Sequence, residues 1–356
     1  MENRPSIAIF ICSRTVGGHE FQVATIVRDL SFLANITVYV NDSNFKKLFS
    51  EKNINIIELN DKLLRRGKLP VHFWSGLMLR RLFYRSRISY DFIIVSAGSV
   101  EASLTVGLAF FKRSPIYLYL PFFFDRAPIW GSFIGNIYNF FLIQVCKIFD
   151  LILTINRIQS HVITSMTSVQ TLVIPNLIRE VAAPIISRRG KLVFIGRLDA
   201  QKRIDELLDW INFEGNPFDE ILIIGDGPLM RELKVFAKGI HHIKVIFLGW
   251  LSAEEQDKLL VCNDLLIINS LLEGEPLVIR EAKKRGMGVL ARDIVGVRGI
   301  TSPSVRYKSR EDLHAKLKSR NPEKIYNGLT RLRTNERLEL RKSTLKKLLS
   351  GNFRLK

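Results

Sequence analysis

The sequence predicts an α/β protein made of two doubly wound domains. Apolar runs of about five or six residues alternate with amphipathic, helix-length stretches along the chain. These runs contain few polar residues, as strands do when helices cover both faces of a parallel sheet. The alternation restarts after about residue 190, and 356 residues suffice for two cores of ordinary domain size.

The first series of elements extends to residue 177. Its predicted strands are rich in β-branched and aromatic residues and cover Ile7–Cys12, Ile36–Val40, Ile54–Leu59, Phe92–Ser96, Ile116–Leu120 and Leu151–Ile155. The segments Glu20–Phe32 and Val100–Phe111 have the length of helices. Together they predict an N-terminal domain of residues 1–177 with one parallel sheet.

The second series starts after a linker of residues 178–190, which contains Pro184 and a polar stretch. Its predicted strands are Leu192–Ile195, Ile221–Ile224, Val245–Leu248, Leu265–Ile268 and Gly288–Ala291. Its predicted helices are Arg203–Ile211, Leu229–Lys238, Ala253–Val261 and Leu277–Arg285. They predict a C-terminal domain of residues 191–334, followed by a basic helix of residues 335–356.

Composition places the chain among folded proteins with excess positive charge. Hydrophobic residues make up 47% and charged residues 24%, and the formal net charge is +19. The cysteines Cys12, Cys146 and Cys262 lie far apart, which argues against a zinc site or disulfide framework and for a reducing compartment. No secretory signal is visible, and polar residues interrupt the most apolar window, Ser132–Ile155. We therefore expect a cytoplasmic protein, peripheral on the inner face of the cell membrane.

Loops at the carboxyl ends of the strands are the expected ligand sites, because doubly wound folds bind ligands there. The first strand leads into Gly17 and Gly18, whose backbone could approach a phosphate at a helix N-terminus; an ordinary tight turn explains the pair equally well. No Gly-x-Gly-x-x-Gly sequence follows any predicted strand, which argues against a dehydrogenase. Gly225 and Gly227, after another strand, are a weak signal of the same kind.

The second domain carries a stronger signal in Arg197 and Lys202, which lie between a strand and a helix together with Arg203. Cations at such a turn can clamp a diphosphate, Arg through forked hydrogen bonds and Lys as a point charge. The alternative is a solvated helix start, but the helix dipole disfavours cations at that end. We therefore favour a diphosphate site.

The strongest segment covers residues 270–282 and contains two glutamates of interest. Pro276 is expected to open a helix, so Glu273 lies in the preceding loop and Glu281 about a turn and a half inside the helix. Both can face one crevice, where ligand hydroxyls would satisfy their carboxylates. The alternative is a pair of exposed glutamates near a helix start, supported by neighbouring cations.

In their order along the chain, these motifs resemble the retaining, nucleotide-sugar-dependent glycosyltransferases of family 4, which have the GT-B fold and often build bacterial surface polysaccharides. The residues that carry the resemblance are Gly17-Gly18-His19-Glu20, Val173-Ile174-Pro175-Asn176, Gly196-Arg197 with Lys202, Gly225-Asp226-Gly227-Pro228, Phe247-Leu248-Gly249 and Glu273-Gly274-Glu275-Pro276-Leu277 with Glu281-Ala282. The resemblance implies two Rossmann-like domains that face each other across a cleft. The first would bind the acceptor and the second the donor, and we expect the last helix to cross back to the first.

The resemblance also assigns roles in the donor site. Arg197 and Lys202 would hold the diphosphate, Glu281 the ribose hydroxyls, and Glu273 the donor sugar near its reacting carbon. The remaining donor contacts would come from Gly17, Gly18, Gly225, Gly227, Leu251, Gly274, Glu275, Pro276 and Leu277. No cofactor and no metal are expected, because fixed cations and a helix N-terminus can stabilise the leaving group and no Asp-x-Asp motif is present.

Three residues depart from the commoner family pattern: Glu275 where Phe or Met is frequent, Arg280 where an aliphatic residue is usual, and Arg203 where Gly often follows the lysine. These departures leave the donor sugar open. In the front-face mechanism proposed for the family, the leaving phosphate can take the acceptor's proton, so an enzyme base is optional. Asp125 is the first candidate for such a base and His19 the second, and a structural role explains either equally well.

The acceptor side is suggested by residues 62–90, a basic stretch without an acidic residue. Cations alternate there with large apolar residues, as in helices that lie in an anionic membrane interface. The residues assigned to the membrane or acceptor are Trp74, Arg80, Arg81, Phe83 and Arg85. A core-packing helix with a basic outer face is the alternative. The pattern favours an acceptor at the membrane, such as a lipid-linked glycan or lipopolysaccharide core.

The sequence therefore predicts transfer of a hexosyl unit to a growing surface polysaccharide, and two other classes remain open. The charge of +19 also suits a basic protein bound to membranes or nucleic acid, although no nucleic-acid recognition motif is present and no such partner is expected. Some proteins of this fold are sugar-nucleotide epimerases, and some relatives have lost activity. The joint presence of Arg197, Lys202, Glu273 and Glu281 argues against loss of the active site.

Overall fold

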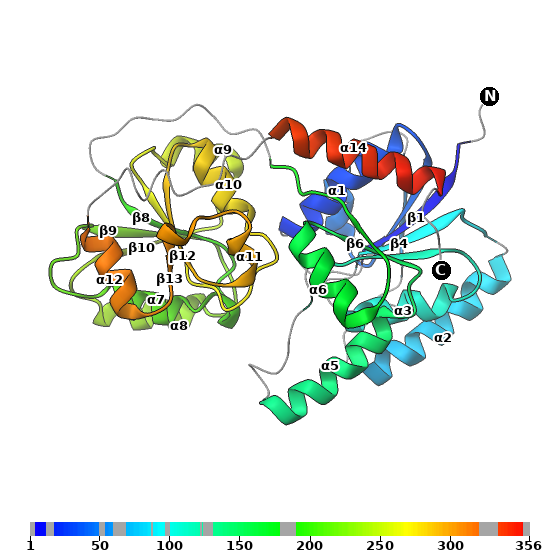
Figure 1. The fold of residues 1–356 in the computed structure, drawn as a ribbon, viewed down its shortest axis with the longest axis horizontal. Coiled ribbons are helices and arrows are strands. Elements are labelled where there is room, and N and C mark those ends of the chain that lie inside the picture. Colours follow the sequence, from blue (N-terminus) through cyan, green and yellow to red (C-terminus); the bar gives the residue numbers. More distant parts are fainter. Residues whose placement is uncertain are drawn as a thin grey trace. The chain divides into compact units, whose positions relative to one another are not determined.

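The computed structural model describes residues 4–11, 18–49, 54–59, 69–86, 88–96, 100–121, 123, 131–178, 190–319 and 334–351. The chain divides into two compact units. The first comprises Met1–Leu177 with Thr334–Lys356, and the second comprises Ile178–Arg333. In Figure 1 the colours from blue to green, together with red, belong to the first unit, and those from green to orange belong to the second.

Over its described residues, the first unit contains a parallel sheet of seven strands in the order β3-β2-β1-β4-β5-β6-β7. The strands are β1 (Ser6–Ile11), β2 (Asn35–Val40), β3 (Ile54–Glu58), β4 (Phe92–Ser96), β5 (Ile116–Tyr119), β6 (Leu151–Thr154) and β7 (Thr171–Val173). The helices are α1 (Gly18–Ser31), α2 (Leu69–Ser86), α3 (Val100–Phe110), α5 (Ser132–Cys146), α6 (Arg157–Thr167) and α14 (Thr334–Ser350). The strand order reverses between β1 and β4, which is the switch point of this sheet.

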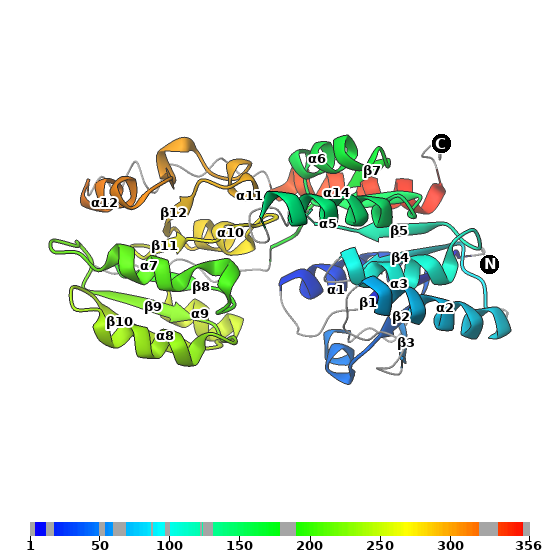
Figure 2. The same cartoon turned by 90° about the horizontal axis from the view of Figure 1, so that it is seen from below.

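Helices cover both faces of this sheet. On one face α2, α3 and α5 bury apolar side chains that include Leu79, Phe110 and Leu142. On the other face α1 and α14 bury side chains that include Val27 and Leu345. Figure 2 shows α2 and α5 on either side of α3, and α3 packs against both. The core is therefore two apolar layers separated by the sheet.

The C-terminal helix α14 is fastened to the first unit by a buried arginine. The Arg341 guanidinium donates to the Asp29 carboxylate at 2.6 Å, to Thr25 Oγ1 at 2.9 Å and to the Pro175 carbonyl at 3.2 Å. A buried guanidinium needs such partners because an unpaired charge inside a protein is costly. The basic tail is thus part of the first unit's fold and not only a solvated helix.

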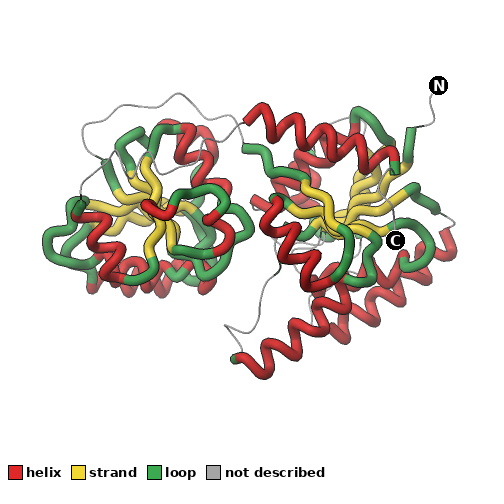
Figure 3. The backbone as a smooth tube through the Cα atoms, in the orientation of Figure 1, coloured by secondary structure: helices red, strands yellow, loops and turns green. Residues whose placement is uncertain are grey.

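Over its described residues, the second unit contains a parallel sheet of six strands in the order β10-β9-β8-β11-β12-β13. The strands are β8 (Leu192–Ile195), β9 (Glu220–Ile224), β10 (Lys244–Gly249), β11 (Leu265–Ile268), β12 (Gly288–Arg292) and β13 (Arg306–Tyr307). The helices are α7 (Ile204–Ile211), α8 (Met230–Phe236), α9 (Ala253–Leu259), α10 (Leu277–Lys284), α11 (Val295–Arg298) and α12 (Arg310–Lys318). Figure 3 shows the strands of each unit enclosed by its helices. The order reverses between β8 and β11, so the loops after these two strands flank the switch point.

The prediction of two doubly wound parallel sheets is confirmed. Two strands escape the sequence pattern, β7 with three residues and β13 with two. Segments this short produce no apolar run that can be told from a loop, and they gain their strand geometry from pairing with β6 and β12. Among the predicted site residues, Gly17 and Asp125 lie outside the described residues.

Candidate active site

The loops that follow β8 and β11 are joined at the carboxyl end of the second unit's sheet. The Leu271 amide donates to the Gln201 carbonyl at 2.9 Å, and Gln201 Nε2 donates to the Leu272 carbonyl at 2.7 Å. These bonds tie together residues that are 70 and 71 positions apart in the chain. They fix the two loops at the switch point, where doubly wound folds bind their ligands.

Lys202 and Glu273 form an ion pair across the joined loops. Lys202 Nζ contacts Glu273 Oε1, and the Ser270 hydroxyl donates to the same oxygen at 2.6 Å. Both charged side chains are largely buried, so weak solvent screening makes the pair stronger than one on the surface. The residues predicted for the diphosphate and the sugar are therefore neighbours, and a bound diphosphate would compete with Glu273 for Lys202.

Arg197, the other predicted diphosphate ligand, is well exposed beside this pair. Its Nε donates to Asp199 Oδ2 at 2.8 Å, and its side chain is 59% exposed. Asp199 also accepts the Gln201 amide at 3.1 Å and caps the short turn η2 (Ala200–Lys202). An exposed guanidinium held by a single carboxylate can turn toward a diphosphate at little cost.

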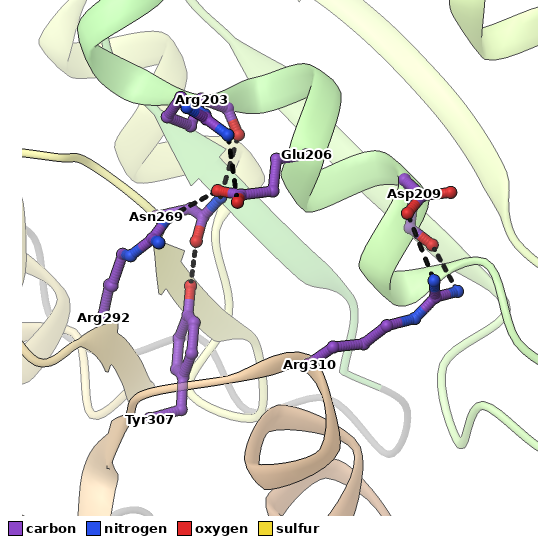
Figure 4. Close-up of polar contacts among 7 residues, drawn as sticks. All are labelled: Arg203, Glu206, Asp209, Asn269, Arg292, Tyr307 and Arg310. Atoms are coloured by element: carbon purple, nitrogen blue, oxygen red, sulfur yellow. Dashed lines mark hydrogen bonds and ion pairs between the residues drawn. The ribbon is translucent and has the colours of Figure 1, made fainter. Parts of the chain in front are cut away.

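Glu206 of α7 anchors three segments around the joined loops (Figure 4). Its carboxylate accepts hydrogen bonds from Arg203 and from Asn269 Nδ2, each at 3.1 Å, and it pairs with Arg292 at the end of β12. Asn269 Nδ2 also donates to the Arg203 carbonyl at 2.9 Å. The sequence does not reveal this role, because an acidic residue in the first turn of a helix usually just matches the helix dipole.

Asn269 connects the network to the edge strand β13. It accepts a hydrogen bond from the Tyr307 hydroxyl at 2.9 Å, and burial raises the pKa of that hydroxyl so that it stays a donor. Arg203 directly follows Lys202, and Asn269 directly precedes Ser270. The network therefore fixes both loops at the residues next to the Lys202–Glu273 pair.

Arg203 occupies a backbone position that favours glycine. Its φ is 49°, in the left-handed region, where η2 meets α7. This conformation gives a physical reason why glycine often follows the lysine in the family. Here the ion pair with Glu206 and the Asn269 bond to the Arg203 carbonyl hold the strained conformation.

We expect the Arg203→Gly protein to be more stable than the Arg203→Val protein by about 1–2 kcal/mol. Both substitutions remove the ion pair with Glu206. Only valine has a Cβ atom, which is the source of strain at a positive φ. Urea unfolding of the two variants measures the difference. Equal stability would show that the backbone at this position carries no strain.

Glu275 and Arg280, two of the departures from the family pattern, face each other inside the protein. The Arg280 guanidinium contacts the Glu275 carboxylate, and their side chains are 3% and 1% exposed. The Glu275 side chain is therefore turned away from solvent, and only its backbone remains for the predicted donor contact. Two of the three departures from the family pattern are therefore in direct contact, and each balances the charge of the other inside the second unit.

Glu281, predicted to bind the ribose, lies in the second turn of α10. Its Oε2 is 3.9 Å from the Arg285 guanidinium, which is hydrogen bonded through Nε to Asp257 Oδ1 of α9 at 3.1 Å. The Glu281 side chain is 16% exposed. A carboxylate oriented at this distance can still accept hydrogen bonds from ligand hydroxyls.

Gly225 and Gly227, predicted to approach the donor, are required by the packing of two loops. A Cβ atom on Gly225 would lie 1.8 Å from the Gly196 carbonyl oxygen, and one on Gly227 would lie 2.4 Å from the Leu198 carbonyl oxygen. The close approach that these glycines permit is therefore first of all to the loop after β8. A donor contact at these positions stays a prediction, as it does for half-buried Leu251, next to the cap of α9.

Residues 181–347 match the sequence profile described as glycosyl transferases group 1. The resemblance to the family 4 glycosyltransferases is confirmed over the segment that carries its densest motifs.

Known proteins resemble this chain in sequence or in fold. UDP-Gal:alpha-D-GlcNAc-diphosphoundecaprenol alpha-1,3-galactosyltransferase of Escherichia coli is 33% identical over 118 residues, which are 31% of this chain and only 30% of the relative's length. Anabaena HepE in complex with UDP-glucose has a TM-score of 0.75 at 16% identity, over 98% of this chain and all of that one. The apo form of the lipopolysaccharide outer core galactosyltransferase WaaB has a TM-score of 0.68 at 17% identity, over the same shares. These structural likenesses confirm the GT-B fold.

In the first unit, His19 lies at the switch point of the sheet. Its Nε2 is hydrogen bonded to Ser96 Oγ, at the end of β4, at 2.8 Å, and its ring stacks on Tyr119 of β5 with 5.3 Å between centroids. Burial lowers the pKa of His19, so the imidazole is neutral at neutral pH and can accept a proton. Gly18 begins α1 just before it. The sequence had not singled out Ser96, because a serine that ends a strand is common.

The basic stretch forms α2, but two of its predicted membrane or acceptor residues serve the fold. Phe83 is buried among aromatic rings of β1, β2 and α3, so the prediction for this residue was wrong: it lies on the inner face of an amphipathic helix. Arg80 donates to two carbonyls at the C-terminal end of α3, at 3.1 and 3.3 Å. Trp74 and Arg81 are exposed, and the Arg85 side chain lies outside the described residues.

Neither a cluster of metal ligands nor a membrane-spanning helix occurs in the described part of the chain. Among the residues that the structure describes, no three His, Cys, Asp or Glu side chains group as metal ligands. None of the described helices is both long and apolar enough to cross a bilayer. Metal-independent transfer stays a prediction.

Proposed function

We propose that this chain is a retaining glycosyltransferase that moves a hexosyl unit from a nucleotide-sugar, without a metal or other cofactor, to a glycan or lipid-linked acceptor. The acceptor is presented at the inner face of the cell membrane during surface polysaccharide biosynthesis. The observation that carries the proposal is the Lys202–Glu273 pair at the switch point, with Ser270 on the same carboxylate. The match of residues 181–347 to the profile of group 1 glycosyl transferases supports it.

The names of two similar proteins favour a particular donor and acceptor chemistry. The Escherichia coli relative is named for UDP-Gal and for a sugar on diphosphoundecaprenol, and HepE was solved with UDP-glucose. These names make a UDP-hexose the first donor to test and a lipid diphosphate the first acceptor. The sequence match to the Escherichia coli relative covers 31% of this chain, so these names serve to choose the first substrates for an assay.

The reaction builds positive charge on the sugar ring and negative charge on the departing diphosphate. Arg197 and Lys202 would stabilise the diphosphate from the loop after β8. A diphosphate that draws Lys202 away from Glu273 would leave this carboxylate beside the reacting carbon, where positive charge develops. The leaving phosphate takes the acceptor's proton; if an enzyme base assists, Asp125 stays the first candidate, and His19, whose imidazole is neutral, the second.

UDP is expected to raise the melting temperature of the protein more than GDP, CDP or ADP, in buffer that contains EDTA. Saturation at about 100 times the Kd stabilises a protein by about 2.7 kcal/mol, a shift of a few degrees. Arg197→Ala is expected to lose most of the shift. Arg310→Ala, which removes another exposed arginine of the same unit, is the matched control and should keep it.

Binding and turnover assays separate this proposal from the other two classes of function. A response to no nucleotide, combined with salt-sensitive binding of single-stranded DNA, would indicate a basic binding protein that kept the fold without the reaction. Conversion of a UDP-sugar to its epimer without acceptor would indicate an epimerase. Transfer to an acceptor, with UDP released, is the result expected here.

A further inference from the structure

The first unit exposes an apolar surface that the donor site does not use. Helices α2 and α5 form it, and they pack on either side of α3 over one face of the sheet (Figures 1 and 2). We name it the α2–α5 face. It is defined by the exposed side chains of Trp74, Leu77, Met78, Arg81, Phe133, Ile134, Ile137, Phe140 and Phe141.

Helix α5 is apolar on its outer side as well as its inner side. Leu142 and Val145 face the core, whereas Phe133, Ile137 and Phe140 recur every three or four residues on the opposite side. Phe133 is 79% exposed and Phe140 is 58% exposed. A helix with large apolar side chains on opposite sides is normally buried on both, and soluble proteins rarely expose a large apolar patch without a partner.

The charges around the face restrict the kind of partner. Neither α2 nor α5 contains an acidic residue. Arg81 is exposed on α2, and two cations after α3 lie over aromatic rings, Arg113 at 5.4 Å from the centroid of Tyr84 and Lys112 at 5.5 Å from that of Phe111. Aromatic side chains mixed with cations and free of carboxylates are typical of surfaces that lie among anionic lipid headgroups.

We propose that the α2–α5 face is a membrane-contacting surface, which inserts its aromatic side chains into the headgroup region of an anionic bilayer. The inference rests on the proposed function and deepens it, because a lipid-linked acceptor is reached from the bilayer surface. A second copy of this chain would also cover apolar side chains. A two-fold dimer through this face would, however, bring like cations together.

Vesicle sedimentation tests the proposal with the full-length protein. The probes are phosphatidylcholine vesicles with and without phosphatidylglycerol. The triple substitution Phe133→Ser, Ile137→Ser and Phe140→Ser is expected to weaken binding to the anionic vesicles by about tenfold or more. Arg81→Glu is expected to weaken binding to anionic vesicles and to leave the weaker binding to neutral vesicles unchanged. The control is Phe32→Ser, because Phe32 is 70% exposed in the same unit but follows α1 on the other face of the sheet.

The outcomes separate this surface from the catalytic proposal. Equal vesicle binding by wild type, the triple variant and Phe32→Ser would overturn the inference. It would also be overturned if the wild-type protein bound neither the anionic nor the neutral vesicles. A dimer in size-exclusion chromatography that the triple variant dissociates would overturn it in favour of self-association. Thermal unfolding at the wild-type temperature shows that the triple variant is folded. Nucleotide binding by that variant should be unchanged, so failure of the donor site and failure of the membrane face give different results.

Discussion

Glu273→Gln is expected to remove most of the transfer activity while UDP binding is kept. Glutamine can still accept the hydrogen bond from Ser270, but it carries no charge to face the sugar's positive transition state. Loss of one electrostatic group aimed at developing charge lowers kcat by about 10²–10³-fold. Because Glu273 also pairs with Lys202, the variant leaves this lysine to the diphosphate, and UDP affinity should be unchanged or higher.

Glu281→Ala is the natural comparison, because it should weaken UDP binding and leave kcat nearly unchanged, the reverse of the effect of Glu273→Gln. The carboxylate predicted for the ribose contributes to binding, so its loss is expected to weaken UDP by about tenfold and to change kcat little. Arg285 keeps its bond to Asp257 in that variant, so α10 should stay in place. Calorimetric titration of UDP and initial rates of UDP release measure both quantities. Wild-type rates in both variants would mean that the site is assigned to the wrong residues.

The sequence predicts those site residues whose motif lies within one short segment of the chain. Lys202 and Glu273 are visible because each stands in a loop after an apolar strand, and the switch-point rule brings such loops together. The Glu206 network cannot be predicted from the sequence, because Asn269 and Arg292 lie 63 and 86 positions from Glu206. Each of these residues alone looks like an ordinary residue at a helix start or a strand end. Pairing between distant polar residues depends on packing that one sequence does not display.

Amphipathic helices show a second limit of the sequence. The basic stretch predicts a helix, and α2 is one, but which of its aromatic residues turn inward depends on α3. Phe83 turns inward and Trp74, 65% exposed, turns outward, although both stand among the same neighbours in sequence. In α5 an interrupted apolar window predicts no membrane span, yet it gives no sign that aromatic side chains line the helix's outer side.

The Glu275–Arg280 pair is expected to show the largest coupling in this protein. Replacing either residue alone, by Glu275→Met or Arg280→Leu, is expected to cost about 3–5 kcal/mol of unfolding free energy, because a buried charge loses its partner. The double replacement restores residue types common in the family. It is expected to be as stable as wild type, or more stable by about 1–4 kcal/mol, because apolar packing avoids desolvating two ions.

A double-mutant cycle by urea unfolding measures this coupling, and the chain supplies its own control. Asp209 and Arg310 form an ion pair at 3.3 Å in the same unit (Figure 4). Both side chains are well exposed, so their coupling should stay below about 1 kcal/mol. A buried Arg280 without Glu275 would have to pull in water or shift α10, and α10 carries Glu281. The single variants should therefore weaken UDP binding as well, while the double variant should recover it. If Glu275→Met alone were as stable as wild type, the charge on Arg280 would have another partner, and the two departures from the family pattern would be independent.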